Sequence, residues 1–431
     1  MIVMKFGGTS VGSADAIRKA GEIVKSSVKK RPVVIVSAVS GITDMLINAA
    51  NNIGRDNTEN FNAIRKKHCE ILDRLGLEMP EVNKLLDEAE ETIESISKLN
   101  AEQLDKAMSF GERLSARIVA AHLEKIGVKA KAYDAFEIGM ATNSKFGEAE
   151  PLNADFEMLR KLDHVAVVTG FIGKDSKGRI TTLGRGGSDY TAAIIGAALD
   201  ADEIQIWTDV DGIYSADPKI VKEAKKIEKI SFNEVAELAF FGAKVLHPKT
   251  LLPAMDRNIP VKVLNTFCSK GSGTIIMNEM KEVTDIVKAV TCKKDNIVVN
   301  MHSTRMLFAH GFLARVFYVF DKYNIPVDML ATSEVSVSLT VDDDTNLEKA
   351  AEELGQISLV DIARGKSIVC VVGAGLKNAT GVAGKVFSVI GRNKIRVEMI
   401  SQGASEINIS FVVDDKDADN AVKVLHKEFV E

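Results

Sequence analysis

The sequence of 431 residues contains few cysteines and no excess of basic residues. Its four cysteines are scattered along the chain and none belongs to a CxxC pair, so we expect reduced thiols in a cytosolic protein rather than a disulfide framework or a zinc site. The 60 Asp and Glu residues outnumber the 55 Lys and Arg residues, and the formal net charge is −5. This balance argues against a general nucleic-acid-binding protein, which would carry a basic stripe.

Long apolar runs are also missing. The longest, such as Val33–Val36 and Ala192–Leu199, are far shorter than the roughly 20 residues needed to span a bilayer, and the apolar start of the chain is too short for a signal peptide. We therefore expect no membrane partner and a cytoplasmic location. Hydrophobic residues make up 46% and charged residues 27% of the chain, which is typical of a globular protein with about two to four domains.

Residues 1–280 alternate between strand-like and helix-like segments. The strand candidates are Ile2–Phe6, Pro32–Val36, Val165–Thr169, Glu203–Thr208 and Val261–Leu264. The helix candidates are residues 14–28, a long charged region over residues 60–125, Asp189–Ala198 and Ser231–Leu238. Strands separated by helices predict one α/β domain with a mostly parallel sheet covered on both faces.

The rest of the sequence contains an internal repeat. The segment Gly311–Phe320 matches Gly381–Ile390, and after a two-residue insertion Glu334–Ser338 matches Glu406–Ser410. A repeat of this length indicates one small domain that has been duplicated.

We place the two copies at residues 295–363 and 364–431, each with strands and helices in the order βαββαβ. The second copy reaches the end of the sequence without its last strand, whereas the strand candidate Ile286–Thr291 has no place in the first copy. We therefore expect a strand at 285–292 to complete the second copy, so that the two small domains are interleaved.

A glycine-rich segment, Lys5–Gly12 (KFGGTSVG), lies where the first strand gives way to a helix. Gly7 and Gly8 permit a close approach of the backbone, the start of a helix favours anions, and Lys5 adds positive charge. These features suit a phosphate group. An ordinary strand–turn–helix junction would also contain such glycines.

A second glycine-rich segment, Thr182–Tyr190 (TLGRGGSDY), also opens a helix. Helix capping would account for Ser188 and Asp189. It does not account for Arg185 among three glycines, and an arginine offers a planar fork for a carboxylate or a phosphate. A binding role is therefore favoured here.

Other candidates come from single positions. Asp209 follows a strand, where ligands bind in parallel sheets. Glu112 lies in an apolar helical setting, where an unpaired carboxylate is costly, and it would either pair with Arg113 or Arg117 or bind a substrate ammonium. Thr43 follows another strand and would serve equally well as a helix N-cap.

Taken together, these segments resemble the aspartate kinases, a branch of the amino acid kinase family. The motifs KFGGTSVG, SGIT, SFGERLS, TTLGRGGSDYTA, WTDVDGIYSADP and FGAKVLHP occur in the family's order, and the repeat resembles the family's tandem ACT domains. The resemblance implies an amino acid kinase fold over residues 1–280, followed by two ferredoxin-like ACT domains. It implies ATP-dependent phosphorylation of the β-carboxylate of L-aspartate to 4-phospho-L-aspartate, the first step toward lysine, threonine and methionine.

This chemistry needs no general base, because an ionised carboxylate is already a nucleophile, and the site must supply positioning and charge neutralisation. The catalytic residues that the resemblance implies are Lys5, Asp189 and Lys244. The residues implied for aspartate are Ser10, Thr43, Glu112, Arg185, Gly186, Gly187 and Ser188. The residues implied for ATP are Lys5, Phe6, Gly7, Gly8, Thr208, Asp209, Tyr214, Lys219, Lys244 and Val245.

In this picture Asp189 orients Lys5, Arg185 holds the α-carboxylate of aspartate, and Glu112 receives its ammonium group. Mg²⁺ would arrive with ATP and be held largely by phosphates and water, without a metal site of the protein's own.

The resemblance also implies feedback regulation. ACT domains of this family pair across a dimer and bind an end-product amino acid, so we expect a homodimer or a dimer of dimers, with lysine as the favoured effector and threonine next. The residues implied for the effector are Met306, Ala309, Phe312, Leu313, Val327, Asp328 and Ser333. A dimerisation module without a ligand is the alternative for the repeat.

Two other functions remain in view. A kinase for another carboxylate, such as N-acetylglutamate, would fit the fold but leave the repeat unexplained. A non-catalytic amino-acid sensor would not require Lys5, Arg185, Asp189 and Lys244 to be intact.

Overall fold

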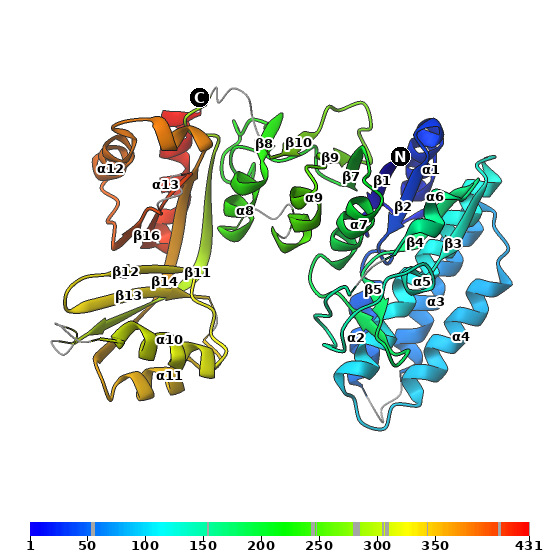
Figure 1. The fold of residues 1–431 in the computed structure, drawn as a ribbon, viewed down its shortest axis with the longest axis horizontal. Helices are drawn as coiled ribbons and strands as arrows, with labels where there is room; N and C mark the ends of the chain where they lie inside the picture. Colours follow the sequence, from blue (N-terminus) through cyan, green and yellow to red (C-terminus); the bar gives the residue numbers. More distant parts are fainter. Residues whose placement is uncertain are drawn as a thin grey trace. The chain divides into compact units, whose positions relative to one another are not determined.

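The computed structural model describes residues 1–52, 57–152, 155–242, 246, 248–278, 285–303, 306, 310–342, 344–403 and 407–430. The chain separates into two compact units (Figure 1). Unit 1 comprises Met1–Ile213, Glu228–Phe232 and Leu246–Glu279, and unit 2 comprises Tyr214–Ile227, Asn233–Val245 and Met280–Glu431.

Unit 1 is built on an eight-stranded sheet with the strand order β3-β4-β2-β1-β7-β9-β10-β8. The strands are β1 (Ile2–Phe6), β2 (Pro32–Val36), β3 (Ala130–Tyr133), β4 (Val165–Thr169), β7 (Glu203–Thr208), β8 (Lys229–Ser231), β9 (Val261–Asn265) and β10 (Thr274–Met277). Only β9 and β10 pair in antiparallel fashion within this described sheet. The prediction of a mostly parallel sheet is therefore confirmed.

Helices cover the two faces of this sheet. Side chains alternate along β1, so that Met4 and Phe6 join a core cluster with residues of α1 to α5, whereas Val3 lies on the face of α7, close to Gly196. The helices of unit 1 are α1 (Ala14–Ser27), α2 (Ile42–Asn51), α3 (Thr58–Leu75), α4 (Pro80–Glu94), α5 (Ala101–Lys125), α6 (Glu157–Arg160), α7 (Gly187–Ala198) and α9 (Leu252–Asp256). The short 3-10 turns are η1 (Val28–Lys30), η2 (Ala135–Glu137) and η3 (Pro248–Leu251).

The long helical region expected over residues 60–125 consists of three separate helices, α3, α4 and α5. The first break lies at Gly76, which has a φ of 63° at the C-terminus of α3, and Pro80 then begins α4. Asn100 begins α5 with a capping box that it shares with Gln103. Each break follows a standard helix stop or start signal.

Unit 2 contains a six-stranded antiparallel sheet with the order β12-β13-β11-β14-β16-β15. Its strands are β11 (Ala289–His302), β12 (Met329–Thr332), β13 (Ser336–Val341), β14 (Leu359–Val372), β15 (Met399–Ser401) and β16 (Asn408–Asp414). Its helices are α8 (Phe232–Phe240), α10 (Phe312–Lys322), α11 (Leu347–Leu354), α12 (Val382–Arg392) and α13 (Asp415–Phe429), with the short turn η5 (Ala374–Asn378).

The two central strands of unit 2 run through both copies of the repeat. Residues 297–302 of β11 pair with β13 in the first copy, while residues 289–293 of the same strand pair with residues 368–372 of β14 in the second. Each copy has its own hydrophobic cluster, and α10 and α11 lie apart from α12 and α13 (Figure 1). This pairing supports our proposal that the copies are interleaved.

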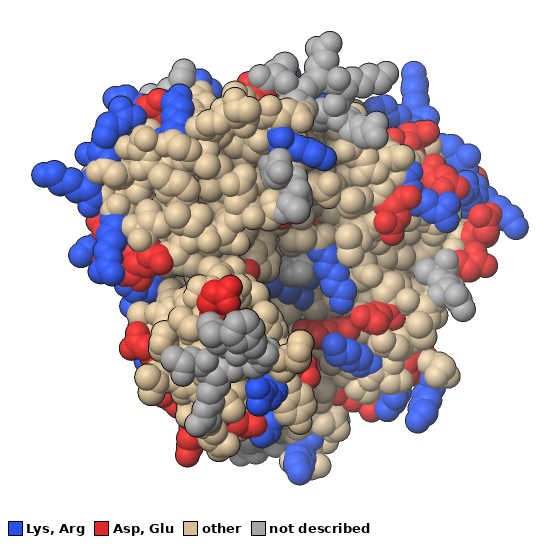
Figure 2. Space-filling view, turned by 60° about the vertical axis from the view of Figure 1, so that its left-hand side comes forward, with Lys and Arg blue, Asp and Glu red and all other residues tan. Residues whose placement is uncertain are grey.

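Two surface properties complete the description. On the face turned forward in Figure 2, basic and acidic side chains are interspersed along the rims, and a broad area between them carries few charges. Among the described residues, no helix combines the length and the apolar character that crossing a membrane would require.

Candidate active site

The carboxyl ends of β1, β2, β4 and β7 meet at one edge of the sheet in unit 1. Backbone hydrogen bonds tie the loops that follow these strands: Gly7 N donates to Trp207 O at 3.0 Å, Ser37 N to Phe6 O at 3.1 Å, and Gly170 N to Val36 O at 2.9 Å. Ligands bind at this edge in open parallel sheets, and both glycine-rich segments lie there.

Lys5 is positioned by the alternation of β1, which directs it toward the face that α7 covers. Its Nζ lies 2.6 Å from Oδ1 of Asp189, in the first turn of α7, and both side chains are largely buried. A Cβ atom at Gly7 would lie 3.6 Å from the same Nζ. Gly7 therefore leaves the ammonium group of Lys5 open toward the loop.

The first glycine-rich turn packs directly on the loop after β2. A Cβ atom at Gly8 would lie 3.0 Å from Ala38 O, and Ser40 N donates to Gly8 O at 3.2 Å. Ser10 is fully buried, and its hydroxyl lies 2.7 Å from Oγ1 of Thr266 while also donating to a backbone carbonyl. The Ser10 hydroxyl therefore already has hydrogen-bond partners within the protein.

The second glycine-rich segment leads from β6 (Ile180–Thr182), which forms a hairpin with β5 (Ile172–Lys174), into α7. The N-cap of α7 is Gly186, with a φ of 72°, and no side chain caps the helix. Ser188 and Asp189 lie inside the first turn, so capping does not account for them. Arg185 is exposed, and its guanidinium forms no hydrogen bond or ion pair with any residue that the structure describes.

Glu112 is buried in α5 and reaches the same edge of the sheet. Its Oε1 accepts a hydrogen bond from Ala38 N at 3.0 Å, while Oε2 is buried without a partner among the described residues. Burial raises the pKa of Glu112 to about 8, although the Ala38 hydrogen bond and the charge of Lys5 act in the opposite direction. A buried carboxylate with one free oxygen is suited to receive a cationic ligand group.

The alternative partners of Glu112 are engaged elsewhere. Arg117 Nη1 lies 2.6 Å and Arg113 Nε 3.1 Å from the carboxylate of Asp134, which is almost fully buried. The sequence analysis missed Asp134, and it also missed Asp105, a buried carboxylate two turns before Glu112 on the same helix. The signal that could have found Asp105 is an acidic residue on the apolar face of a helix.

The remaining candidates in unit 1 lie nearby on the sheet. Phe6 is fully buried and stacks on Trp207. Thr208 ends β7, and its hydroxyl donates to Asp209 Oδ1 at 3.1 Å. Thr43 is the second residue of α2, whose N-cap is Gly41, so Thr43 is not the N-cap.

Some candidate residues belong to unit 2 or are not described. Tyr214 and Lys219 are part of unit 2, where Lys219 is exposed. Lys244, Val245 and Ala309 lie outside the described residues.

The candidate effector residues lie in the first copy of the repeat. Phe312 begins α10 and is buried, whereas the neighbouring Leu313 is 38% exposed. Met306 and Val327 pack against the hydrophobic cluster of this copy. Asp328 Oδ2 accepts a hydrogen bond from Lys293 Nζ at 2.6 Å, and Ser333 bonds to Ser336 in the turn after β12.

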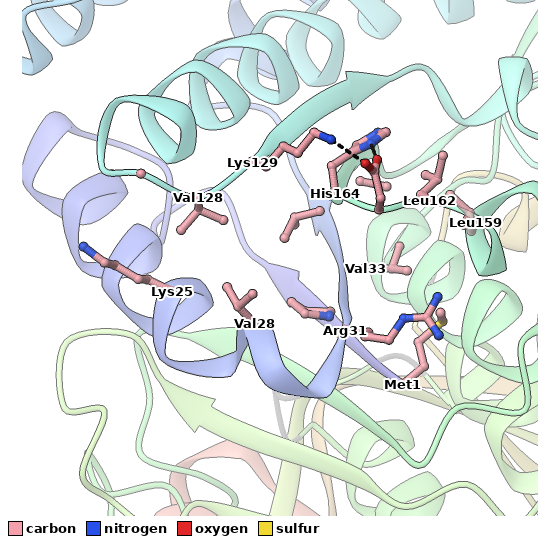
Figure 3. Close-up of a pocket in the computed structure, with 15 residues that line it drawn as sticks. Met1, Lys25, Val28, Arg31, Val33, Val128, Lys129, Leu159, Leu162 and His164 are labelled. Atoms are coloured by element: carbon pink, nitrogen blue, oxygen red, sulfur yellow. Dashed lines mark hydrogen bonds and ion pairs between the residues drawn. The ribbon is translucent and has the colours of Figure 1, made fainter.

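A pocket of about 310 Å³ lies at the opposite edge of the sheet in unit 1. It is lined by residues at the amino ends of β2 and β4, among them Arg31, Val33 and His164, and by Lys25 and Lys129 (Figure 3). None of the candidate residues lines it. We therefore assign the site to the carboxyl edge and not to this pocket.

The two parts of the chain match the models of two known families. The model of the amino acid kinase family matches residues 1–265, and an ACT domain model matches residues 369–429. The lysine-sensitive aspartokinase 3 of Escherichia coli (strain K12) is 39% identical in a match that covers 100% of this chain and 99% of the relative. Crystal structures of E. coli aspartokinase III, 38% identical over the full length of both chains, have TM-scores of 0.88 with aspartate and ADP (R-state) and 0.83 with lysine and aspartate (T-state).

Proposed function

The chain belongs to the amino acid kinase family and, within it, to the aspartokinases, and from this premise we propose that the carboxyl edge of the sheet in unit 1 transfers the γ-phosphoryl group of ATP to the β-carboxylate of L-aspartate. The observation that carries the proposal is the convergence of three charged groups. The Lys5–Asp189 ion pair, the half-paired Glu112 and the exposed Arg185 all lie on segments that meet at this edge.

Lys5 supplies the positive charge for the phosphate groups, and Asp189 holds its side chain in place through the 2.6 Å ion pair. Phosphoryl transfer requires mainly positioning and charge neutralisation, and the attacking aspartate carboxylate is already ionised. We propose that the phosphates lie along the backbone of Gly7 and Gly8, where a Cβ atom at Gly8 would come within 3.0 Å of Ala38 O.

Aspartate is recognised by two opposite charges. Arg185 pairs with its α-carboxylate in a planar, bidentate geometry, while Glu112 receives its α-ammonium group. Burial raises the pKa of Glu112 and so disfavours its ionised form. In our proposal the ammonium group of the substrate supplies the positive charge that stabilises the ionised carboxylate. Ser10, Thr43, Gly186, Gly187 and Ser188 complete the aspartate site in our proposal.

For the nucleotide we propose Phe6, Thr208 and Asp209 of unit 1, in addition to the segment from Lys5 to Gly8, and the family resemblance also implies Tyr214, Lys219, Lys244 and Val245. Among the described residues, no group of three or more His, Cys, Asp or Glu side chains could hold a metal ion. We propose that Mg²⁺ is carried in by ATP and held mainly by phosphate oxygens and water. Bound in this way, Mg²⁺ neutralises phosphate charge.

The repeat regulates this activity, with lysine as the proposed effector and threonine next. The E. coli relative is named lysine-sensitive, and one of its structures contains lysine. Titrating the initial rate with lysine and, separately, with threonine tests this assignment. An unchanged rate with both amino acids would leave the repeat as a dimerisation module.

We also propose that unit 2 mediates a homodimer. Exposed apolar side chains support this proposal, notably Leu359 at 77%, Tyr318 at 65% and Ile400 at 49% exposure. Light scattering coupled to size-exclusion chromatography should give twice the chain mass of 46.7 kDa, or four times for a dimer of dimers.

The decisive test of the reaction compares phosphorylation of aspartate and of N-acetylglutamate under the same conditions. We expect ADP to be produced with aspartate and not with N-acetylglutamate. Activity only with N-acetylglutamate would reassign the substrate, and no activity with either would favour the amino-acid sensor.

A further inference from the structure

We propose that Asp105 is a positioning residue for the substrate aspartate, because it fixes the segment that carries Arg185. The proposal rests on the proposed role of Arg185, and the experiments below separate the two. Asp105 lies in α5, is 1% exposed, and does not itself reach the edge of the sheet where the charged groups meet.

Three hydrogen bonds converge on the Asp105 carboxylate. Oδ2 accepts from Thr182 N at 2.7 Å and from Gly147 N at 2.9 Å, and Oδ1 accepts from the hydroxyl of Thr182 at 2.9 Å. Thr182 is the last residue of β6, three residues before Arg185. The carboxylate thus holds the chain where it leaves the hairpin and enters the arginine loop.

The second contact of Asp105 also reaches this loop. A Cβ atom at Gly184 would lie 3.0 Å from Gly147 O, and Gly184 has a φ of 76°. The segment around Gly147 therefore packs against the residue next to Arg185. Holding Gly147 and Thr182 together fixes the loop from two sides, while Gly186 begins α7 on its far side.

The Asp105 carboxylate accepts all three hydrogen bonds, and two of the three donors are backbone N–H groups. Truncation of Asp105 to alanine would leave both N–H groups and the Thr182 hydroxyl without this acceptor. Leaving a buried donor without a partner is costly. A side chain whose only task was to fill space would not need this chemistry.

The position of Asp105 relative to Glu112 adds a second argument. The two carboxylates are seven residues apart in one continuous helix, which places them two turns apart on the same face, separated by about 10 Å along the axis. Glu112 is proposed to bind the ammonium group of aspartate, and Asp105 supports the loop proposed to bind its carboxylate. One rigid helix therefore sets the distance between the two halves of the aspartate site.

The primary test is Asp105→Ala, which removes the acceptor of all three hydrogen bonds, with steady-state kinetics for both substrates. We expect KM for aspartate to rise about tenfold or more, because small displacements of a binding group are strongly penalised, while KM for ATP changes less than twofold. Thr182→Val removes only the hydroxyl contact and should raise KM for aspartate by a smaller factor. If Asp105→Ala does not fold, this milder variant decides, and an unchanged KM would overturn the proposal.

Asp175→Ala is the control in the same hairpin. Asp175 is a buried carboxylate in the hairpin turn that accepts hydrogen bonds from Lys177 N, Arg179 N and the Ser144 hydroxyl, each at 2.9 Å, and also pairs with the Arg179 guanidinium at 2.7 Å. We expect this variant to lower thermal stability without changing KM for aspartate. An equal rise of KM in the Asp175 and Asp105 variants would mean that loosening the hairpin is sufficient, and the specific role of Asp105 would be refuted.

A double-mutant cycle with Arg185→Ala separates this inference from the proposed function. If Arg185→Ala leaves KM for aspartate unchanged, the role of Arg185 itself fails. If Arg185→Ala raises KM and Asp105→Ala does not, only the inference fails. If both raise KM, Asp105→Ala should add little in the Arg185→Ala background, and full additivity of the two effects would contradict a path through the arginine.

Discussion

The two units differ in how they satisfy their partly buried charges. In unit 1, Glu112 keeps one oxygen without a described partner and Arg185 is exposed and unpaired among the described residues. In unit 2, Lys293 lies 2.6 Å from Asp328 and 2.9 Å from Asp342, and Lys366 lies 2.8 Å from Glu398 and 2.7 Å from Asp414. Lys293 and Lys366 are paired within unit 2, whereas Glu112 and Arg185 are the charges of unit 1 that we propose a ligand completes.

The ion clusters of unit 2 follow the internal repeat. Asp328 and Glu398 occupy matching positions of the two copies, and so do Asp342 and Asp414 after the two-residue insertion. In both copies a lysine bridges the matching pair. The two acidic positions are thus shared by the copies, and the Asp328 side chain is shorter and more deeply buried than that of Glu398, at 5% against 20% exposure.

The largest effect is expected for Lys5→Ala, which tests whether the charges of unit 1 serve the reaction. If the charges of unit 1 serve the reaction, loss of the Lys5 ammonium should lower kcat by about 10³-fold, and it should also lower the melting temperature because it leaves the largely buried Asp189 without its partner. The initial rate of ADP release at saturating substrate measures kcat, and a thermal melt measures the melting temperature. A variant with unchanged turnover would remove Lys5 from the mechanism.

The next largest effect is expected for Glu112→Gln, which should raise KM for aspartate about tenfold or more. In the parent protein KM for aspartate should fall as the pH rises toward about 8, because the bound ammonium group requires ionised Glu112 and burial raises the pKa of this carboxyl to about 8. The glutamine variant should lose this pH dependence. Retention of the same pH profile would assign it to another group.

Ionisation of Glu112, which favours the binding of aspartate, lowers the stability of the ligand-free protein. The pKa of Glu112 in the folded state lies above the ordinary value of 4.5, so the folded protein keeps a proton that the unfolded chain has lost. The stability that Glu112 contributes is therefore complete below pH 4.5 and declines as the pH rises through 8. Urea unfolding at a series of pH values, with Glu112→Gln as the control, measures this contribution.

A smaller effect distinguishes the two copies within unit 2. Lys293→Met and Lys366→Met should each lower the free energy of unfolding by about 1–3 kcal/mol, because each leaves two carboxylates close together in a partly exposed site. Only Lys293→Met should also shift the concentration of lysine that gives half-maximal regulation, because Lys293 contacts Asp328. Equal shifts in both variants would contradict an effector site confined to the first copy.

The smallest effect is expected at Lys219, which belongs to unit 2 but is assigned to the nucleotide. Because it is exposed, Lys219→Ala should raise KM for ATP only about two- to fivefold and leave the melting temperature unchanged. A change in stability without a change in KM would place Lys219 with the structural charges of unit 2.

The sequence predicted the central strands of unit 1 because β1, β2, β4 and β7 are short and largely buried runs, but it did not predict β3, β8 and β10. The limits of β1, β2, β4 and β7 agree with the expected ranges. The sequence analysis did not predict the helix breaks around Gly76, Pro80 and Asn100, although their signals are local. The charge pattern of residues 60–125 indicates a single helical region and does not mark these breaks.

The contacts of the site were harder to predict. Asp105 and Thr182 are 77 positions apart, and no local pattern connects them. The pairing of Lys5 with Asp189 followed from the family resemblance, because composition and spacing do not set which strand residue faces which helix turn. Sequence spacing likewise does not predict that Arg113 and Arg117 pair with Asp134, because Asp134 follows a strand and both arginines lie on a helix.

The strands β11 and β14 have a mechanical consequence for unit 2. Each is a single stretch of 14 residues that contributes hydrogen bonds to both copies. Fraying at one end of β11 therefore weakens the ladder that the neighbouring copy uses, and the two copies should melt in one cooperative transition. Division of the chain between residues 363 and 364 would sever β14 itself and leave neither half with a complete sheet.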